Sequence, residues 1–286
     1  MSALFLLNYN TGMRWNQIII FAVLAILLLG CRKPIDNYEE ENSPFFAGEF
    51  APTDYPFAGD LKIITWNIHF ALEIDQAIKE LQEVTDLQDA DIILLQEMDE
   101  LGTEEIAKTL EYNYIYYPAS IHTKHDNNFG NAILSKWELS EPEKLILPHK
   151  NPTNDQIRIA TKAVTIIDDL QITLYSVHIE TAWLSGTKRN EQVDAIIEAI
   201  GNDDYVFVGG DFNSVTQANV TGLDNMFSEI DMIRVSEGAE PTVKVVGTGF
   251  SADHVFARNA NLIENNVYAE TEASDHFPVW AHVSLK

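Results

Sequence analysis

The chain has 286 residues, of which 46% are hydrophobic and 10% aromatic, enough to build one large core. Its formal net charge of -26 excludes the basic stripe of a dedicated nucleic-acid binder, but it leaves open a nuclease that meets phosphate through a bound cation. The single cysteine, Cys31, excludes disulfide frameworks and zinc sites built on cysteine.

Residues 1–30 are expected to be a secretory signal. Ile18 to Leu29 is an unbroken apolar run. It is too short to span a bilayer, which takes roughly 20 residues, but it suits the core of a signal peptide. The following Gly30-Cys31 completes a sequence that resembles a bacterial lipoprotein box. We therefore expect lipidation at Cys31, with an ordinary cleaved signal or a short anchor beside a chance cysteine as the alternative.

Residues 31–58 are expected to form a tether. Four prolines and the acidic run 39–41 favour an extended chain. Aromatic rings in the second half indicate that this part docks on the domain, because a freely disordered linker would not carry so many. These rings are Phe45, Phe46, Phe50, Tyr55 and Phe57. The remaining residues, 59–286, are assigned to one domain.

Apolar runs and amphipathic stretches alternate through this domain. Strands are expected at 61–68, 91–96, 112–117, 130–135, 160–167, 171–177, 205–210, 254–257, 262–267 and 279–285, and helices at 77–84, 103–110 and 187–200. Thr103 is expected to be the N-cap of its helix, and residues 215–250 are expected to be rich in loops. The mixture favours an α+β fold (an α/β sandwich), in which two mixed β-sheets pack face to face with helices outside.

Polar residues recur where these strands end. They are Asn67, Glu97, His178, Asp211 and Asn213, followed by Asp253-His254 and Ser274-Asp275-His276 near the C-terminus. Ligands of sheet proteins bind where strand ends converge. An oxygen-rich donor set suits Mg2+, or alternatively Mn2+, better than zinc. A cation neutralises phosphate charge and an imidazole handles protons, so the set is suited to attack on a phosphoester.

Seven short motifs together resemble the endonuclease/exonuclease/phosphatase family, which has the DNase I-like fold. They occur in family order between residues 60 and 286, and each is weak alone. They are Thr65-Trp66-Asn67-Ile68, Leu95-Gln96-Glu97, Gly130-Asn131-Ala132-Ile133-Leu134-Ser135, Ser176-Val177-His178, Gly209-Gly210-Asp211-Phe212-Asn213, Asp253-His254-Val255 and Ser274-Asp275-His276-Phe277-Pro278.

The resemblance implies a role for each matching residue. Glu97 would hold the metal, and Asn67 and Asp275 would help to bind or orient it. Asp211 would orient or deprotonate the attacking water, and Asn213 would hold that water or the phosphate.

The two histidines of the motifs would complete the chemistry. Asp253 would pair with His276 and raise its basicity. His276 would then contact the scissile phosphate or act as the base, and His178 would be the general acid near the leaving oxygen. Which group takes the proton from water stays open at this point.

Two further residues are candidates for substrate binding. Family members often place an arginine that faces phosphate just before the strand expected at 160–167, and Arg158 stands at that position. That Arg158 is an ordinary surface arginine is an equal alternative. Asn131 is a candidate on the same terms. Arg189 and Gln192 are interpreted as structural. His254 is interpreted as a packed core histidine, and His122, His125 and His149 as solvated loop residues, of which His122 or His125 could border the site.

These observations predict a Mg2+-dependent phosphoesterase that hydrolyses phosphodiesters or phosphomonoesters by in-line attack of water. Its substrate would be a small molecule, a phospholipid head group or nucleic acid. A secreted endonuclease of DNase or RNase type is the first alternative, and a non-catalytic binding lipoprotein on the same fold is the second. The protein is expected to be an exported monomer, anchored in a membrane through its lipid on the periplasmic or cell-surface side.

Overall fold

The computed structural model describes residues 35–122, 124–245 and 247–286. The predicted signal (1–30) and Cys31 lie outside the described residues. No helix within these ranges has the length and hydropathy that crossing a bilayer requires.

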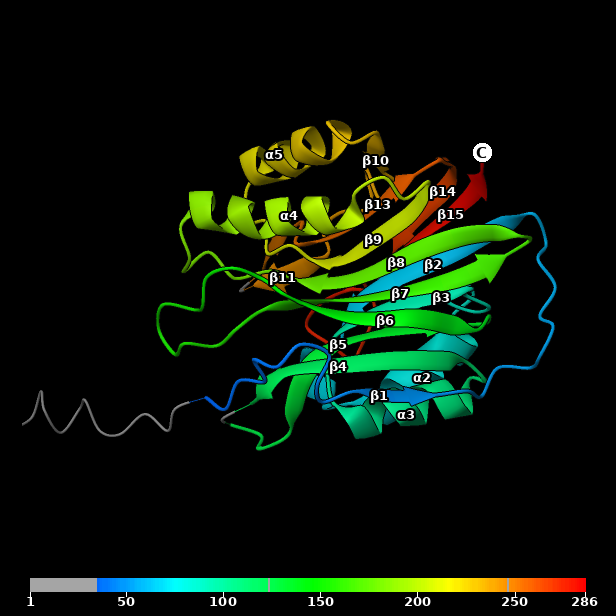
Figure 1. The fold of residues 1–286 in the computed structure, drawn as a ribbon, viewed down its shortest axis with the longest axis horizontal. Helices are drawn as coiled ribbons and strands as arrows, with labels where there is room; N and C mark the ends of the chain where they lie inside the picture. Colours follow the sequence, from blue (N-terminus) through cyan, green and yellow to red (C-terminus); the bar gives the residue numbers. More distant parts are fainter. Residues whose placement is uncertain (1–34, 123, 246) are drawn as a thin grey trace, which may run out of the picture. The chain divides into compact units, whose positions relative to one another are not determined.

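Two mixed β-sheets pack face to face (Figure 1). The first has seven strands in the order β1 (Phe46–Gly48), β4 (Asn113–Ile121), β5 (Asn128–Ser135), β3 (Ile92–Met98), β2 (Asp60–Asn67), β15 (Val279–Leu285) and β14 (Ala260–Val267). The second has six in the order β10 (Met232–Arg234), β13 (Asp253–Arg258), β9 (Tyr205–Asp211), β8 (Leu170–His178), β7 (Ile159–Ile167) and β6 (Leu139–Ile146). A separate hairpin joins β11 (Val243–Val245) to β12 (Thr248–Phe250).

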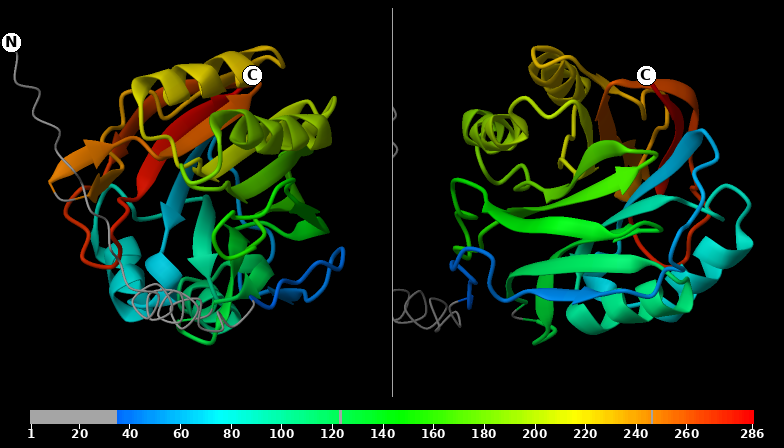
Figure 2. Two further views of the ribbon diagram at one scale, coloured as in Figure 1. Left: turned by 90° about the vertical axis from the view of Figure 1, so that its left-hand side faces the viewer. Right: turned by 45° about the vertical axis from the view of Figure 1, so that its right-hand side comes forward.

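Helices cover the outer face of each sheet. A short 3-10 turn, η1 (His69–Ala71), follows β2. The helices α2 (Ile74–Glu83) and α3 (Glu100–Thr109) pack on the first sheet, and α4 (Gly186–Ile200) and α5 (Gln217–Ser228) pack on the second (Figures 1 and 2). The predicted α+β sandwich of two mixed sheets with helices outside is therefore confirmed.

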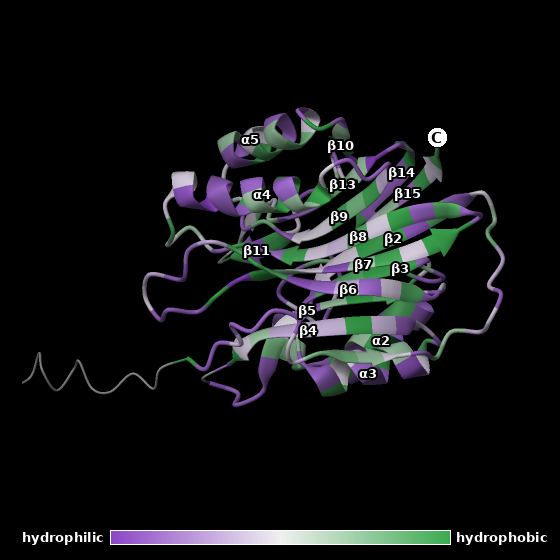
Figure 3. Cartoon of the chain, in the orientation of Figure 1, coloured by the Kyte–Doolittle hydropathy of each residue, from purple (hydrophilic) through white to green (hydrophobic). Residues whose placement is uncertain are grey.

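The alternation of side chains along each strand produces three apolar layers. In β2, Ile63 points into the core between the sheets, whereas Ile64 and Trp66 point toward the helices α2 and α3. In β9, Phe207 joins the central core and Val208 packs under α4 and α5. Hydrophobic and hydrophilic residues accordingly mix along the same strands in Figure 3. This alternation also decides which strand-end residues point inward at the site.

Gly209 and Gly210 at the end of β9 serve the packing of the sheets. A Cβ at Gly209 would lie 2.6 Å from Leu94 Cδ1, and a Cβ at Gly210 would lie 1.9 Å from the carbonyl oxygen of Val177 on the neighbouring strand. Protein atoms therefore fill the space that a side chain at either position would need.

Two expectations about elements were wrong, and the strand prediction was incomplete. Residues 215–250, expected to be loop-rich, contain α5 and the strands β10, β11 and β12. The helix α3 begins at Glu100, where the side chain of Asp99 accepts a hydrogen bond from the N–H of Gly102, so Asp99 and not Thr103 is the N-cap. The strand β6 had not been predicted.

The compact unit begins at Ile35, earlier than residue 59. The predicted docking of the tether is visible in β1, which pairs with β4, and in rings that pack on the domain. The rings of Phe45, Phe46 and Phe50 each contact one tyrosine of β4, at ring-centroid distances of 5.1 to 6.3 Å. Most of the predicted tether is therefore part of the fold.

Candidate active site

Asn67 joins the two sheets at the edge where β2, β3, β8 and β9 end, on the left of Figure 1. Its Nδ2 donates to Glu97 Oε1 at 3.2 Å and to Asp211 Oδ2 at 3.1 Å. Its Oδ1 accepts from the backbone N–H of His69 at 3.0 Å. Asn67 therefore orients the two carboxylates toward each other across the sandwich.

Glu97 reaches this position through a β-bulge. The pairing of β3 with β5 shifts register between Gln96 and Met98, and Glu97 between them has a φ of 59°. Gln96 faces the second sheet, where its Nε2 donates to Ser176 Oγ, and Met98 packs under the helices. The extra residue lets Glu97 turn toward the site while its neighbours keep their faces.

The two carboxylates linked by Asn67 both hold their protons more tightly than usual. Burial raises the pKa of Glu97 to about 7. Burial and the nearby charge of Asp253 raise the pKa of Asp211 to about 6. The raised pKa values mean that the surrounding protein groups supply too little positive charge to hold both carboxylates in their ionised form.

His276 is paired with Asp253 as the motifs implied. Its Nδ1 lies 2.9 Å from Asp253 Oδ2, and its Nε2 lies 3.9 Å from Asp211 Oδ2. Burial lowers the pKa of His276, but the carboxylates of Asp253 and Asp211 outweigh burial and raise it to about 10. His276 therefore carries a positive charge at neutral pH.

The Asp253 carboxylate is only half satisfied. Its Oδ2 also accepts from Thr242 Oγ1 at 2.8 Å. Its Oδ1 is buried and has no hydrogen-bond partner among the described residues. One oxygen or nitrogen from each of Asp211, Asp253 and His276 lies within 4.8 Å of the others, a grouping that could hold a cation.

His178 is buried between Arg158 and Asp211. Its Nδ1 lies 3.3 Å from Arg158 Nη1, and its Nε2 lies 3.4 Å from Asp211 Oδ2. A guanidinium can only donate, so Nδ1 must accept and the ring proton lies on Nε2, facing Asp211. Burial and the charges of Arg158 and His276 hold the pKa of His178 well below its usual value. The ring is thus a neutral donor at Nε2.

Arg158 lies at the site, but it is held by a residue that sequence reasoning missed. Its Nε and Nη2 lie 3.2 and 3.4 Å from the two oxygens of the fully buried Glu180. Burial alone would raise the pKa of Glu180, but Arg158 and the N–H of Thr181 keep it below its usual value. The only sequence signal for Glu180 was its position two residues after His178. This spacing was not used, because the predicted strand ended before Glu180.

Asn213 and Asn131 are engaged with backbone. Asn213 Nδ2 donates to the carbonyl of Ile179, and Asn131 Nδ2 donates to the carbonyls of Ile159 and Ser176. Asn213 lies at the site edge, and Asn131 is a buried link between the sheets. The amide hydrogens of Asn131 are therefore directed into the protein, which disfavours its predicted contact with substrate.

Arg189 and Gln192 have the structural roles expected of them. Arg189 Nη2 donates to the carbonyls of Phe212 and Asn213, which fixes the turn after Asp211. Gln192 accepts from the N–H of Glu180 and donates to the carbonyl of Pro148.

Asp275 lies at the rim of the site. Ser274, which precedes it, donates from Oγ to the carbonyl of Asn67 at 2.6 Å. The side chain of Asp275 is 56% exposed, and its Oδ1 lies 3.7 Å from Nδ1 of His69. The turn that follows β2 carries His69 away from the inward face, and it pairs with Asp275 at the rim.

His122 and His125 border the site, in line with the expectation that one or the other could do so. The ring of Phe70 stacks on His122 at 4.3 Å, and His122 stacks on His125 at 5.0 Å. Phe129 connects this stack to His178, with 5.8 Å between ring centroids. Both histidines lie in the loop between β4 and β5, as expected, and both are partly buried.

His254 is a core histidine, as predicted. It is 1% exposed and its Nε2 lies 2.8 Å from Ser214 Oγ. Burial and the charge of Arg234 lower its pKa to about 3.

The carboxylates at this edge are suited to a hard divalent cation. Two carboxylates with raised pKa values and a buried carboxylate oxygen that has no partner among the described residues mark negative charge that protein groups leave uncompensated. Asp211 and Asp253 supply oxygens within the cluster, Asn67 links Asp211 to Glu97, and oxygen donors suit Mg2+ or Mn2+.

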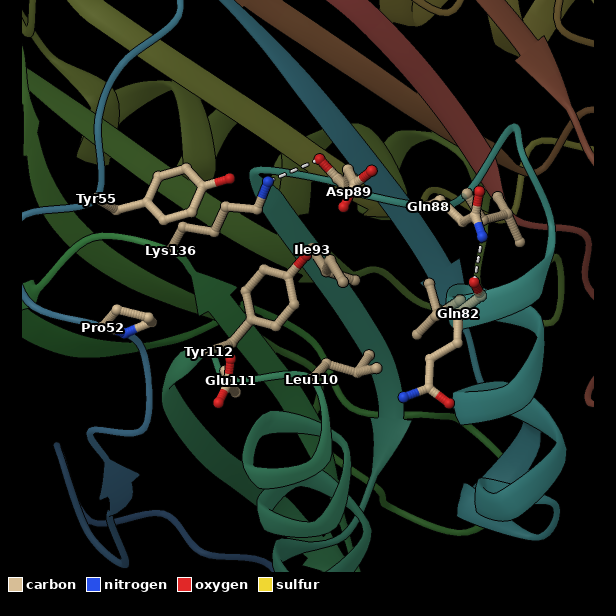
Figure 4. A pocket seen from close by; sticks show the side chains of 12 residues that line it. Pro52, Tyr55, Gln82, Gln88, Asp89, Ile93, Leu110, Glu111, Tyr112 and Lys136 are labelled. Carbon is tan, nitrogen blue, oxygen red and sulfur yellow. Dashed lines mark hydrogen bonds between the residues drawn. The ribbon is translucent and has the colours of Figure 1, made fainter.

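A surface pocket of about 440 Å3 lies at the opposite edge of the first sheet (Figure 4). Tyr55 and Lys136 stand on one side of it and Gln82 and Gln88 on the other. None of the candidate catalytic residues lines it. Here the docked segment 52–55 meets the domain, away from the chemistry.

Comparison with known proteins gave a family match and several similar folds. The model of the endonuclease/exonuclease/phosphatase family matches residues 64–276. A search of curated proteins found no match.

Solved structures with the same fold come from bacteria and animals. An endonuclease/exonuclease/phosphatase family protein from Leptotrichia buccalis C-1013-b is 18% identical, with a TM-score of 0.66 over 79% of this chain and 100% of that one. The TDP2 protein of D. rerio, solved with a single-strand DNA product, is 17% identical, with a TM-score of 0.62 over 79% and 99%. The human Nocturnin catalytic domain, solved with a sulfate anion, is 16% identical, with a TM-score of 0.62 over 81% and 97%.

Proposed function

The chain belongs to the endonuclease/exonuclease/phosphatase family, and from this premise we propose that it is a Mg2+-dependent phosphoesterase that cleaves its substrate by in-line attack of water. The observation that carries the proposal is the cluster of Asp211, Asp253 and His276, which faces Glu97 through Asn67. A non-catalytic binding protein would have no need of a charged histidine beside two carboxylates that resist ionisation.

His276 and His178 are both hydrogen-bond donors in this proposal. With a pKa of about 10, His276 is an imidazolium at neutral pH and offers Nε2–H to a phosphate oxygen. His178 offers the proton of a neutral ring at Nε2. This favours a hydrogen bond that stabilises developing charge over the general-acid role that the family resemblance implied for His178.

Asp211 is the base in this scheme. Its pKa of about 6 places it near the pH at which the reaction would run, and it lies between the two donors His178 and His276. Asn67 and the N–H of Asn213 each hold one of its oxygens, at 3.1 and 2.8 Å. The carboxylate is thus aimed at one position, where the attacking water would lose its proton.

Glu97 is the proposed principal metal ligand, with Asn67 orienting it and Asp253 Oδ1 as a further oxygen donor. A bound Mg2+, or alternatively Mn2+, would polarise the phosphoryl oxygens and neutralise their charge. The carboxylate of Asp275, at the rim of the site, is proposed to help steer the cation or the substrate into place. Arg158 is proposed to add positive charge on the side of His178, in the Glu180-bound position that it already has.

A small or membrane-presented phosphoester is the proposed substrate. The net charge of -26 disfavours tight binding to duplex DNA, because phosphate electrostatics dominate nucleic-acid affinity. A secreted nuclease is the second candidate, supported by the similarity to TDP2, whose structure holds a DNA product. We also propose export of the protein, cleavage of residues 1–30 and lipidation of Cys31, which would anchor a monomer in the membrane.

The test is hydrolysis by residues 35–286 of a soluble diester, a soluble monoester, plasmid DNA, RNA and sphingomyelin, each with Mg2+ and with a chelator. His276→Ala is expected to lower turnover at least about 100-fold. His282→Ala is the matched control, because His282 pairs with Asp60 at the opposite edge.

The outcome separates the alternatives. Mg2+-dependent turnover that His276→Ala removes and His282→Ala keeps supports the enzyme, and the preferred substrate distinguishes phosphatase, nuclease and lipase. A folded protein that neither turns over any substrate nor binds Mg2+ by calorimetry contradicts the proposal and favours the binding lipoprotein.

A further inference from the structure

The chain enters the domain at the edge that carries the catalytic residues. The backbone oxygen of Asp36 accepts from the N–H of Ile121 at the carboxyl end of β4. Asn37 forms a bridge with Ser120, and Tyr38 OH donates to Asn128 Oδ1 at the start of β5, at 2.9 Å. These contacts fix residues 36–38 at one place on the rim.

That place adjoins the His178 side of the site. Asn37 Oδ1 accepts from the N–H of Ile157 at 3.1 Å, and the next residue is Arg158, whose Nη1 lies 3.3 Å from His178. Asn128, which holds Tyr38, precedes Phe129, whose ring lies 5.8 Å from that of His178.

Cys31 is only four residues before Ile35. Four residues of fully extended chain span at most roughly 14 Å. A lipid on Cys31 would therefore hold the catalytic edge close to the bilayer, whereas the opposite edge could not reach it. Figure 2, left, looks onto the catalytic edge.

Five segments at this edge each expose one large apolar side chain: three loops, the first turn of α3 and the strand β11. Leu72 follows Asn67 in the chain, Leu101 follows Glu97, Trp183 follows His178, Val215 follows Asn213, and Val245 lies in the hairpin whose Val243 bridges to His276. They are between 42% and 76% exposed, and Trp183 is the most exposed of them. Tryptophan and leucine are side chains that insert at the boundary between head groups and acyl chains.

We propose that these five segments form a membrane-contacting rim, and that the active site takes phosphoesters presented by the head groups of a lipid bilayer. The inference rests on the proposed function and on the lipidation of Cys31. The acidic surface selects the kind of bilayer: a chain with a net charge of -26 is repelled by anionic lipids, so the partner is a zwitterionic surface.

The contact is tested with the full, lipidated chain in phosphatidylcholine vesicles. Lipids brominated near the head group quench a tryptophan that lies at that depth. We expect quenching in the unaltered protein, its loss in Trp183→Phe, and its retention in Trp137→Phe, because Trp137 packs against Tyr55 far from the catalytic edge.

The substrate is tested by comparing a head-group phosphodiester in the same vesicles with a soluble diester. The double variant Leu72→Ser, Trp183→Ser is expected to lose about tenfold on vesicles and nothing on the soluble diester. The matched control is Ile166→Ser, Ile263→Ser, which removes two exposed apolar residues from outside these five segments and is expected to change neither rate.

Three results overturn the inference: no acyl chain on Cys31 by mass spectrometry, no quenching that depends on Trp183, or equal losses on vesicles and on the soluble diester. Failure of the proposed function has a different signature. In that case neither the unaltered protein nor any variant hydrolyses the soluble diester. Quenching of Trp183 still decides whether the rim contacts the bilayer.

Discussion

Asp253 sets the charge of the histidine on which the proposed chemistry depends. Its Oδ2 lies 2.9 Å from His276 Nδ1, and Asp211 adds a second negative charge near Nε2. The pKa of His276 is raised from 6.5 to about 10, so the pairing stabilises the fold fully below about pH 6.5 and is lost as the pH rises through about 10.

Asp253→Asn is expected to bring the pKa of His276 back toward its usual value and to lower turnover by about 100-fold or more. Histidine resonances followed by NMR during a pH titration check the first effect, and steady-state kinetics check the second. An unchanged titration of His276 would show that Asp211 alone holds its charge.

Glu97 predicts how metal binding depends on pH. Burial raises its pKa to about 7, and a metal ligand must be deprotonated. Mg2+ affinity is therefore expected to rise with pH up to about 7 and to fall about tenfold for each pH unit below that value. Calorimetry across this range measures the affinity.

The variant Glu97→Gln tests the assignment of that dependence. It is expected to weaken Mg2+ binding and to flatten its pH dependence, whereas Glu111→Gln, at an exposed position by the pocket of Figure 4, should leave both unchanged. A steep dependence that survives in Glu97→Gln would assign the titration to Asp211.

At the residue scale, the sequence was informative where a residue is the first or the last of a strand. Asn67, Asp211 and Asp253 meet because parity along a strand fixes the direction of the side chain. Glu180 and Asp275 lie in turns, where parity does not apply. Their partners, Arg158 and His69, could be known only once the turns were built.

The elements were predictable where apolar periodicity is strong. The helix α5 was missed because only Val220, Leu223 and Phe227 mark its buried side, among polar residues and Gly222. The bulge at Glu97 was missed as well, since one extra residue in a strand leaves no mark on an apolar run.

The close approach of β8 and β9 makes Gly210 a structural requirement. Gly210→Ala would place a methyl group against the backbone of Val177, so we expect a loss of about 3 kcal/mol in the free energy of unfolding. Gly222→Ala is the control, because a Cβ there meets nothing within 4 Å and a helical alanine should add about 0.5–1 kcal/mol. Urea unfolding measures both, and a stable Gly210→Ala protein would mean that the strands can separate without cost.

At the scale of the whole molecule, residues 35–58 belong to the stability of the domain. Besides the rings on β4, Lys144 Nζ donates to the carbonyl of Tyr38, and the side chain of Asn42 accepts from the N–H of Lys144. The sequence indicated that the rings dock, but not the pairing of β1, because a three-residue strand has no readable period.

A protein that starts at residue 59 is therefore expected to be less stable than one that starts at residue 35. Removing six aromatic rings and β1 should cost at least about 3 kcal/mol, through exposure of the apolar surface of Tyr114 and Tyr116. Thermal unfolding of the two proteins measures the difference. Equal midpoints of thermal unfolding would show that residues 35–58 act only as a linker.

The last strand has a practical consequence. β15 starts beside Thr65 at the catalytic edge and ends beside Asp60, so Lys286 emerges at the far side of the sandwich. An affinity handle fused there would display the catalytic face to the solution when the protein is captured on a chip or bead. A handle fused before Ile35 would press that face against the support, and an assay on such a surface would understate the activity.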